Sequence, residues 1–294
     1  MGDITKAIVP IAGLATRFLP LSKAVPKELL PVGTKPMLHY GLEELKAAGV
    51  KQVIFIVGGN KKQVADYLKR SPYLEKLLTD RNQTAILEEM EELEKSLEGL
   101  SFFFVSVQKP LGDGHAVLQA KKLVGEEPCF VFYPDDIIEA KTPACVQLAQ
   151  VFKTSQKPVT ALARIPRERL VSYGVVATEK IAQRLHKIKK IVEKPQGEAP
   201  SDLAIVGRRI ITPEVFDYLK RAKPNKKGEV VLSEALGDMV KDGKIVYGYE
   251  IEGRWWEAGT RTEWLKTHLY FSLKHPVYGK ELKRFVKDLK IENV

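Results

Sequence analysis

The chain of 294 residues has few cysteines and no long hydrophobic run. Its two cysteines, Cys129 and Cys145, lie far apart and outside any C-x-x-C pattern, so their spacing indicates neither a disulfide framework nor a zinc site. No stretch approaches the roughly 20 apolar residues that span a membrane, and the first residues lack the charged and apolar segments of a signal peptide. We therefore expect buried free thiols, no membrane partner and a cytoplasmic location.

Two common nucleotide-binding motifs are also missing. The sequence holds no G-x-x-x-x-G-K-[ST], and Gly112-Asp113-Gly114 is not followed by the third glycine of G-x-G-x-x-G. P-loop NTPases and dinucleotide-dependent dehydrogenases are therefore disfavoured. The net charge of +10 suits an acidic partner, but few aromatic residues lie among the lysines, which favours a solvated surface over a nucleic-acid site.

The first half alternates short apolar runs with amphipathic stretches, a pattern typical of βαβ units around a mostly parallel sheet. We expect strands at residues 6–11, 52–57, 102–107 and 129–133, with helices that begin near Met37 and that cover 61–69. Residues 77–100 place apolar side chains at helical spacing, which predicts a packed helix.

The second half changes character after Val159. Strand-like runs follow one another at shorter spacing, which predicts antiparallel strands that form a smaller lobe: PVTALAR, GVVATE, HKIKKIVE and LAIVGRR. Residues 265–289 are predicted to be helical, with a break at Pro276. The predicted fold class is therefore α/β, with a Rossmann-like mixed, mostly parallel sheet flanked by helices and a smaller antiparallel lobe.

Charged residues follow two of the predicted strands. Asp135 and Asp136 come directly after the strand at 129–133, at the edge where open α/β sheets bind ligands. The strand at 6–11 is followed by a turn of small residues and three cations, Arg17, Lys23 and Lys27. Such a loop lets backbone N–H groups approach a ligand closely while the cations neutralise a polyphosphate.

This loop, AGLATRFLPLSKAVPKELLP, resembles the signature of sugar-1-phosphate nucleotidyltransferases, which is close to GxGTRxxPxTxxxPKxLxP. It departs from that pattern at Ala15, usually Gly, and at Ser22, usually Thr. Later segments agree in order and spacing over nearly the entire chain: Gln108 with GDGHAV, then SYGVV, VEKP, SDLAIVGRRIITPEVF and GEVVLSEAL. GHAV together with LAIVGR resembles the glucose-1-phosphate uridylyl branch, from which Asp113 and Asp202 depart.

The resemblance implies a nucleotide-diphospho-sugar transferase fold in one nucleotidyltransferase domain, 1–294. Within it we expect a nucleotide-binding half at 1–155, a sugar-phosphate-binding half at 156–260 and C-terminal helices at 261–294. It also implies that Arg17 and Lys27 hold a triphosphate and that Lys194 meets the phosphate of the sugar. Ala12, Gly13, Gln108 and Gly114 would surround the base, while Gly174, Glu193 and Gly207 would line the sugar. Each of these residues taken alone could instead be structural, for example a strand bulge at Gly174.

A magnesium site is implied by the same likeness. Asp135 is the candidate ligand, because a hard cation that bridges phosphate oxygens takes one or two carboxylates and keeps several waters. Relatives often supply a second aspartate from a late D-x-G segment, and here Glu257 stands at that position. Glu257 could alternatively be a structural carboxylate that binds no metal. Asp136 would orient the site, or cap the next element.

The reaction that the resemblance implies is direct attack by glucose-1-phosphate on the α-phosphorus of UTP, which gives UDP-glucose and pyrophosphate. The attacking phosphate is ionised at neutral pH, so no general base and no catalytic histidine is needed. Two alternatives stay open: a changed nucleotide or sugar preference, such as dTTP, and a non-catalytic nucleotide-sugar or nucleic-acid binding protein. By analogy with relatives, the chain is expected to form a homo-dimer or homo-tetramer.

Overall fold

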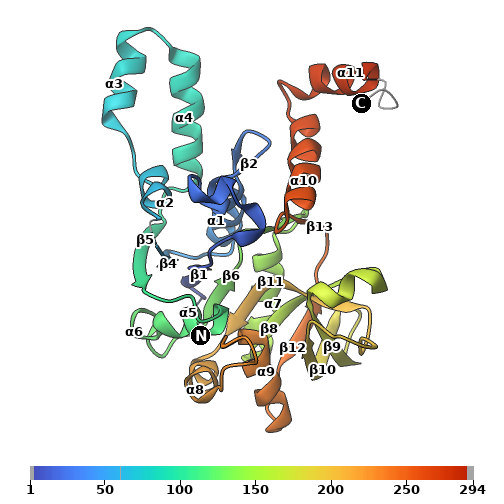
Figure 1. The fold of residues 1–294 in the computed structure, drawn as a ribbon. Coiled ribbons are helices and arrows are strands. Elements are labelled where there is room, and N and C mark those ends of the chain that lie inside the picture. The colour runs from blue at the N-terminus through green and yellow to red at the C-terminus, as the bar shows by residue number, and fades with distance from the viewer. Residues whose placement is uncertain (1–2, 60, 290–294) are drawn as a thin grey trace.

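One mixed sheet organises the computed structural model, which describes residues 3–59 and 61–289 (Figure 1). Its strands lie in the order β5-β4-β1-β6-β11-β8-β12-β10-β9. They are β1 (Lys6–Ile11), β4 (Gln52–Gly58), β5 (Ser101–Val107), β6 (Cys129–Phe132), β8 (Val159–Arg164), β9 (Gly174–Lys180), β10 (Leu185–Glu193), β11 (Leu203–Ile211) and β12 (Tyr247–Glu250). Two further sheets of two strands each pair β2 (Pro31–Val32) with β3 (Lys35–Pro36) and β7 (Asp136–Glu139) with β13 (Arg254–Glu257).

The strands of the first half are parallel to one another, as the sequence predicts. β1 lies between β4 and β6 and pairs in parallel with both, for example Ile8 with Ile54 and Val131, and β5 extends this set beyond β4. The carboxyl ends of these strands therefore meet at one edge of the sheet. The loops that leave that edge, after Ile11 and after Phe132, are the two segments in which the sequence places its charged residues.

Mostly antiparallel strands complete the sheet, as the sequence predicts, although β12 pairs with β8 in parallel. β11 runs antiparallel to β6 on one side and to β8 on the other, while β9 and β10 form an antiparallel pair farther out. β11 is buried along its whole length. It therefore joins the parallel and antiparallel parts into one continuous sheet.

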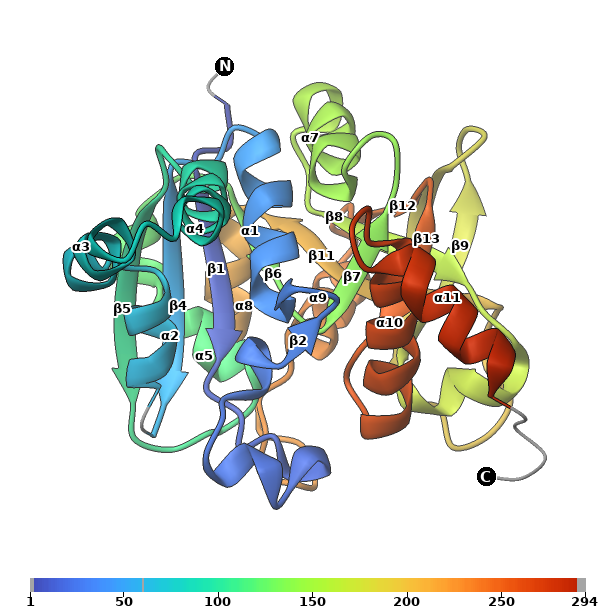
Figure 2. The same ribbon diagram turned by 90° about the horizontal axis from the view of Figure 1, so that it is seen from above.

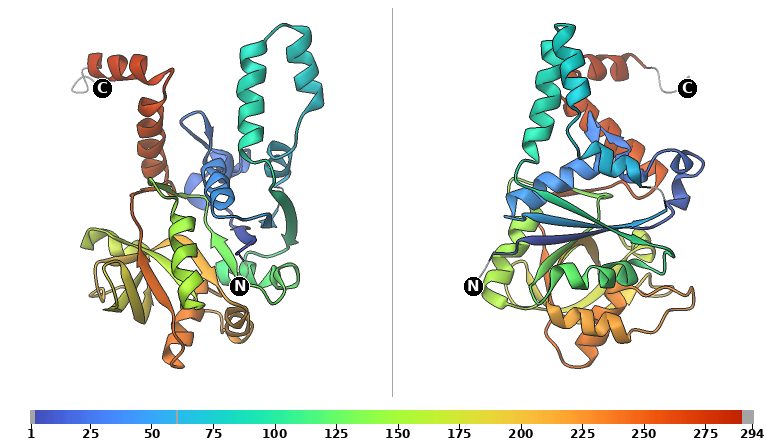
Figure 3. Two further views of the ribbon diagram at one scale, coloured as in Figure 1. Left: turned by 180° about the vertical axis from the view of Figure 1, so that it is seen from behind. Right: turned by 90° about the vertical axis from the view of Figure 1, so that its left-hand side faces the viewer.

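Alternate residues of the strands fill two cores on opposite faces of the sheet. In β1, Ile8 belongs to one core, whereas Ala7, Val9 and Ile11 belong to the other. Helices cover both faces, as the side view in Figure 3 shows. The helices are α1 (Met37–Ala47), α2 (Lys62–Tyr67), α3 (Pro72–Asp80), α4 (Thr84–Ser96), α5 (Asp113–Gln119), α6 (Lys121–Val124), α7 (Ala144–Ser155), α8 (Pro213–Arg221), α9 (Leu232–Lys241), α10 (Arg261–Lys274) and α11 (Gly279–Asp288), with 3-10 turns at Thr16–Phe18, Leu21–Lys23, Lys27–Leu29 and Arg167–Ser172.

The segment at 77–100 is helical, but it does not pack into the body as the sequence predicts. It lies within the antiparallel pair α3 and α4, which projects away from the sheet (Figures 1 and 3) and has no buried residue. α3 and α4 contact each other, but Leu74 and Ile86 are exposed, and the segment reaches a core at its end, through Leu97 and Leu100. α10 and α11 lie on the other side of the molecule (Figure 2), and the break between them falls at residues 275–278, around Pro276.

Cys129 and Cys145 are buried free thiols, as expected. Burial raises the pKa of both thiols, which keeps them protonated. Across residues 3–59 and 61–289, no helix has the length and apolar character needed to cross a membrane.

Candidate active site

A cleft of about 840 Å³ opens where the two parts of the sheet meet. Eight of the predicted site residues line it: Arg17, Asp135, Asp136, Gly174, Glu193, Lys194, Gly207 and Glu257. They come from the loop after β1, the turn after β6, the strands β9, β10 and β11, and the end of β13. The carboxyl edge of the parallel strands is therefore one wall of the cleft, and the antiparallel strands form the opposite wall.

The loop after β1 holds its shape through a strained residue. Ala15 has φ 49° and ψ 42°, in the left-handed region, which costs a non-glycine residue roughly 1–2 kcal/mol. The hydroxyl of Ser22 donates to the carbonyl of Ala15 at 3.0 Å. The two positions that depart from the signature thus contact each other. Arg17, two residues farther on, is exposed and reaches the cleft.

Lys27 and Asp135 form the charged centre of this edge. The ammonium of Lys27 donates to Oδ2 of Asp135 at 2.7 Å, and each side chain is 23% exposed. Burial opposes the charge on Lys27, but the carboxylates of Asp135 and Glu28 outweigh it and raise the pKa of Lys27. Burial likewise disfavours the Asp135 anion, but Lys27 outweighs it and lowers the pKa of Asp135. Both groups are therefore ionised at neutral pH.

Asp136 has no free carboxylate oxygen directed at a ligand. Its Oδ2 accepts from the backbone N–H of Gly207 at 2.8 Å, and its Oδ1 accepts from the indole N–H of Trp255 at 2.7 Å. Burial, followed by the negative charge of Asp135, raises the pKa of Asp136 to about 7. These contacts tie Asp136 to β11 and β13, which favours the first of the two roles that the sequence left open, that of orienting the site.

Gly207 is required because no side chain fits there. A Cβ at this position would lie 2.3 Å from Oδ2 of Asp136 and 2.8 Å from Cβ of Tyr133. We expect Gly207→Ala to lower the free energy of unfolding by about 1–3 kcal/mol, because overpacking forces the turn after β6 to move. Urea denaturation measures this change. Gly237→Ala is the matched control, since its Cβ would meet nothing closer than 3.6 Å, and an equal loss in both variants would contradict the explanation.

Glu193 and Gly174 face each other across the antiparallel wall. Oε2 of Glu193 accepts from the hydroxyl of Ser233 at 2.6 Å, and a Cβ on Gly174 would approach the same oxygen to 3.0 Å. The ammonium of Lys194 lies 3.4 Å from Oε1 of Glu193. Lys194 itself has φ 46°, and its N–H donates to the carbonyl of Tyr173 at 3.0 Å. The arrangement leaves the Lys194 side chain half exposed in the cleft.

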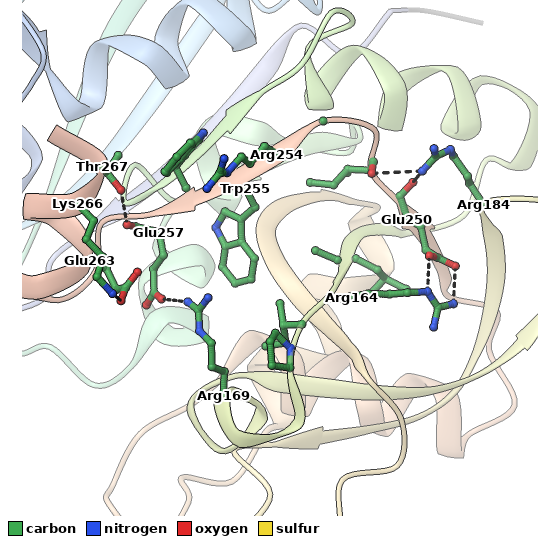
Figure 4. Close-up of a pocket in the computed structure, with 17 residues that line it drawn as sticks. Arg164, Arg169, Arg184, Glu250, Arg254, Trp255, Glu257, Glu263, Lys266 and Thr267 are labelled. Atoms are coloured by element: carbon green, nitrogen blue, oxygen red, sulfur yellow. Dashed lines mark hydrogen bonds and ion pairs between the residues drawn. The ribbon is translucent and has the colours of Figure 1, made fainter. Parts of the chain in front are cut away.

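Glu257 lies between the cleft and a second cavity of about 540 Å³, which is drawn in Figure 4. Its Oε2 accepts from Arg169 at 2.9 Å and from the hydroxyl of Tyr173. Figure 4 shows Arg169 and Glu257 pointing toward each other, while Glu250 pairs with Arg164 at the other end of the cavity. Oε1 of Glu257 is turned toward Gly259, where Asp135 also points.

The four residues assigned to the base do not line this cleft as the structure describes it. Ala12 follows β1 and is buried, with its carbonyl close to Gly58 of β4, and Gln108 follows β5 at the same edge and is exposed. Gly13 is exposed beside Ala12, while the N–H of Gly114 donates to the carbonyl of Val230 at 2.9 Å. These residues do not line the cleft themselves, although Gly114 directly follows Asp113, which does.

Sequence reasoning missed the arginine pair of β11. Arg208 is 1% exposed and forms a two-pronged ion pair with Glu44 of α1 at 2.9–3.0 Å. It also donates to the backbone carbonyls of Tyr133 and Asp136, so it fixes the turn that carries Asp135. Arg209 points into the cleft. Two adjacent arginines inside an otherwise apolar strand could have indicated these contacts, because buried cations need partners of opposite charge or hydrogen-bond acceptors.

The fold and the site define a class of enzyme that handles a nucleotide at the edge of a mixed α/β sheet. A family model for nucleotidyl transferases matches residues 6–271, which include β1, the loop after it, both aspartates and Glu257. The chain belongs to the nucleotidyl transferase family.

The chain is similar over nearly its full length to relatives that share one name. The chain is 37% identical over 290 residues to a UTP--glucose-1-phosphate uridylyltransferase of Staphylococcus haemolyticus, covering 98% of this chain and 99% of that protein. It is 36% identical to the protein of the same name in Staphylococcus epidermidis, over 99% of this chain. Among solved structures it is similar to a UTP-bound UGPase of Acinetobacter baumannii, with a TM-score of 0.89, 31% identity and coverage of 98% and 100% of the two chains. A UDP-glucose pyrophosphorylase complexed with UDP-glucose matches with a TM-score of 0.84 and 31% identity, over 92% of this chain and 100% of that one.

Proposed function

We propose that this protein is a UTP:glucose-1-phosphate uridylyltransferase. It transfers a uridylyl group from UTP to glucose-1-phosphate and releases pyrophosphate. The observation that carries the proposal is the cleft itself. Arg17 of the loop after β1 and Lys194 both line it, together with the polar residues Asp135 and Glu193. Full-length similarity to proteins of this name supports the same reaction.

The reaction needs positioning and charge neutralisation more than proton transfer. A phosphate oxygen of glucose-1-phosphate attacks the α-phosphorus of UTP, and the bond from that phosphorus to the β-phosphate oxygen breaks as pyrophosphate leaves. A phosphate monoester is already ionised at neutral pH, since its second pKa is about 6. Lys27 and Arg17 are assigned to the triphosphate, Lys194 to the phosphate of the sugar, and Glu193 and the backbone at Gly174 and Gly207 to the sugar. Ala12, Gly13, Gln108 and Gly114 are assigned to the uracil.

The residues at the cleft fit a magnesium ion. Oδ2 of Asp135 and Oε1 of Glu257 lie 3.2 and 3.5 Å from the point that a Cβ on Gly259 would occupy, so glycine leaves an open space flanked by two carboxylates. Within the described part of the chain, no group of three or more His, Cys, Asp or Glu side chains could hold a metal. Two carboxylates suit magnesium, which retains waters and takes its other ligands from substrate phosphates. When bound, the ion neutralises charge on the phosphates during transfer.

Glu257→Gln tests this metal assignment. The amide keeps the shape of the side chain but removes its charge, so we expect the magnesium concentration for half-maximal activity to rise roughly 10-fold or more. Magnesium titration of the steady-state rate, with thermal unfolding to verify the fold, measures the effect. Glu263→Gln is the control, because Glu263 lines the second cavity and pairs with Lys266. An unchanged magnesium requirement in Glu257→Gln would leave Glu257 as a structural carboxylate.

A nucleotide panel tests the specificity. Pyrophosphate release is measured with glucose-1-phosphate and each of UTP, dTTP, CTP, ATP and GTP, and then with UTP and other hexose-1-phosphates. We expect the combination of UTP and glucose-1-phosphate to give the highest kcat/KM. A preference for dTTP would favour the thymidylyl alternative. If no combination of nucleotide and sugar phosphate were turned over, a binding protein would be favoured.

Homo-oligomer formation and a cytoplasmic location remain predictions. Apolar side chains exposed along α10 and α11 favour association with a second copy: Leu265, Leu269, Val277, Tyr278 and Phe285. Light scattering of the purified protein measures its mass, and a monomer at micromolar concentration would contradict the prediction.

A further inference from the structure

Arg209 is a buried cation whose hydrogen-bonding capacity is mostly unused. The side chain is 7% exposed and lines the cleft from β11. A guanidinium carries five N–H donors. Within residues 3–59 and 61–289, Arg209 makes one side-chain hydrogen bond, from Nη1 to the hydroxyl of Tyr133 at 3.1 Å, and its buried Nε has no partner. Buried polar groups are normally satisfied, so the missing acceptors point to a ligand.

The Tyr133 hydroxyl that anchors Arg209 is itself fixed. It donates to the carboxylate of Asp113, whose other oxygen accepts from the backbone N–H groups of Gly114 at 2.8 Å and Leu232 at 3.2 Å. Burial raises the pKa of Tyr133 well above its usual value, so the hydroxyl stays protonated. Asp113, Tyr133 and Arg209 therefore form a rigid polar group on the wall of the cleft, and Arg209 is held in place before a substrate binds.

The position of Arg209 places it beside residues that are assigned to the sugar. Side chains two residues apart in a strand share a face, so Arg209 lies on the same face of β11 as Gly207, and both line the cleft. Glu193 is close enough for its charge to act on Arg209, and it too lines the cleft. With Asp113 and Glu193 nearby, the single positive charge of Arg209 is already balanced. A further anion such as a phosphate therefore gains little here, and a neutral hydroxyl is the acceptor that fits.

We propose that Arg209 is a specificity-determining residue that donates hydrogen bonds to hydroxyl oxygens of the hexose in the sugar-1-phosphate. The inference rests on the proposed function, because the proposed function supplies the substrate, a hexose-1-phosphate. A site built to hydrogen-bond a hydroxyl strongly rejects the analogue that lacks it, since the buried donor is then left unpaired. The enzyme should therefore discriminate against one or more deoxy sugars through this side chain.

The test combines Arg209→Met with glucose-1-phosphates that are deoxygenated singly at C2, C3, C4 or C6. We expect the unmodified enzyme to lose about 10-fold or more in kcat/KM with at least one analogue. Arg209→Met should lose a similar factor with glucose-1-phosphate, mainly through KM for the sugar phosphate, and should accept that analogue as well as glucose-1-phosphate. KM for UTP should not change. Arg221→Met is the control, because Arg221 is exposed and pairs with Asp242.

Arg209→Lys provides a second variant if the methionine variant does not fold. Lysine keeps the charge but cannot reproduce the planar fork, so the same loss of discrimination is expected. An equal fall with every sugar, or a change confined to KM for UTP, would overturn the inference while the proposed function stands. Absence of turnover by the unmodified enzyme with glucose-1-phosphate would instead overturn the proposed function, and this inference with it.

Discussion

Lys27→Ala is expected to lower kcat by about 100-fold or more while the protein stays folded. Lys27 is ionised, and its ammonium lies 2.7 Å from Asp135 at the carboxyl edge of the parallel strands. Removing it leaves the negative charge of Asp135 unopposed where a triphosphate must bind. The charge that develops on the leaving pyrophosphate then has one cation fewer to stabilise it, which affects the transition state more than substrate binding. Steady-state kinetics with both substrates measures kcat and each KM.

Lys35→Ala is the matched control for Lys27→Ala. Lys35 is 26% exposed and pairs with the carboxylate of Glu43 at 2.6 Å. It therefore resembles Lys27 in its exposure and in having a carboxylate partner, but it lies on the β2–β3 hairpin. Its loss should leave kcat within about twofold, as expected for a surface ion pair. If Lys27→Ala retained near-normal kcat, Lys27 would be a structural partner of Asp135 and nothing more.

Asp135→Asn is expected to have an effect of similar size, about 100-fold or more in kcat. Asparagine preserves the volume of the side chain but carries no charge, so it neither holds a divalent cation nor balances Lys27. Without the carboxylate of Asp135, the effect of burial on Lys27 would be less compensated by negative charge, so the pKa of Lys27 would fall. The kinetic loss should therefore persist at saturating magnesium.

Glu139→Gln tests whether any lost carboxylate near β7 has the same effect. Glu139 accepts from Tyr270 at 2.9 Å and pairs with Lys274, away from the cleft residues. Its kcat should stay close to that of the unmodified enzyme. Full activity of Asp135→Asn would remove Asp135 from the catalytic machinery and with it the proposed magnesium site.

Much of the fold follows from sequence periodicity, and the exceptions have physical causes. Short apolar runs bounded by turns gave the strands of the main sheet except β12, because buried strands leave few polar positions. Residues 77–100 show the limit of this reasoning. Apolar spacing predicts a helical face, but it does not say whether that face meets the core, and in α3 and α4 no residue is buried.

Some residues of the candidate site could be predicted from the sequence, whereas the contacts between distant segments could not. Asp135 and the loop after β1 were placed together because parallel strands deliver their carboxyl ends to one edge. The later segments of the resemblance supplied Glu193 and Glu257, which no local pattern would have singled out. Contacts from distant segments could not be predicted: Arg169 with Glu257 is separated by 88 residues, and Arg209 with Tyr133 by 76. These pairs depend on how the antiparallel strands align, which the register of the folded sheet decides.

The most direct test is to incubate the purified protein with magnesium, UTP and glucose-1-phosphate and to measure UDP-glucose and pyrophosphate together. Direct in-line transfer predicts equal amounts of the two products, dependence on a divalent cation, and no pyrophosphate release when glucose-1-phosphate is omitted. Pyrophosphate released from UTP alone, or no UDP-glucose under any of these conditions, would contradict the proposed function.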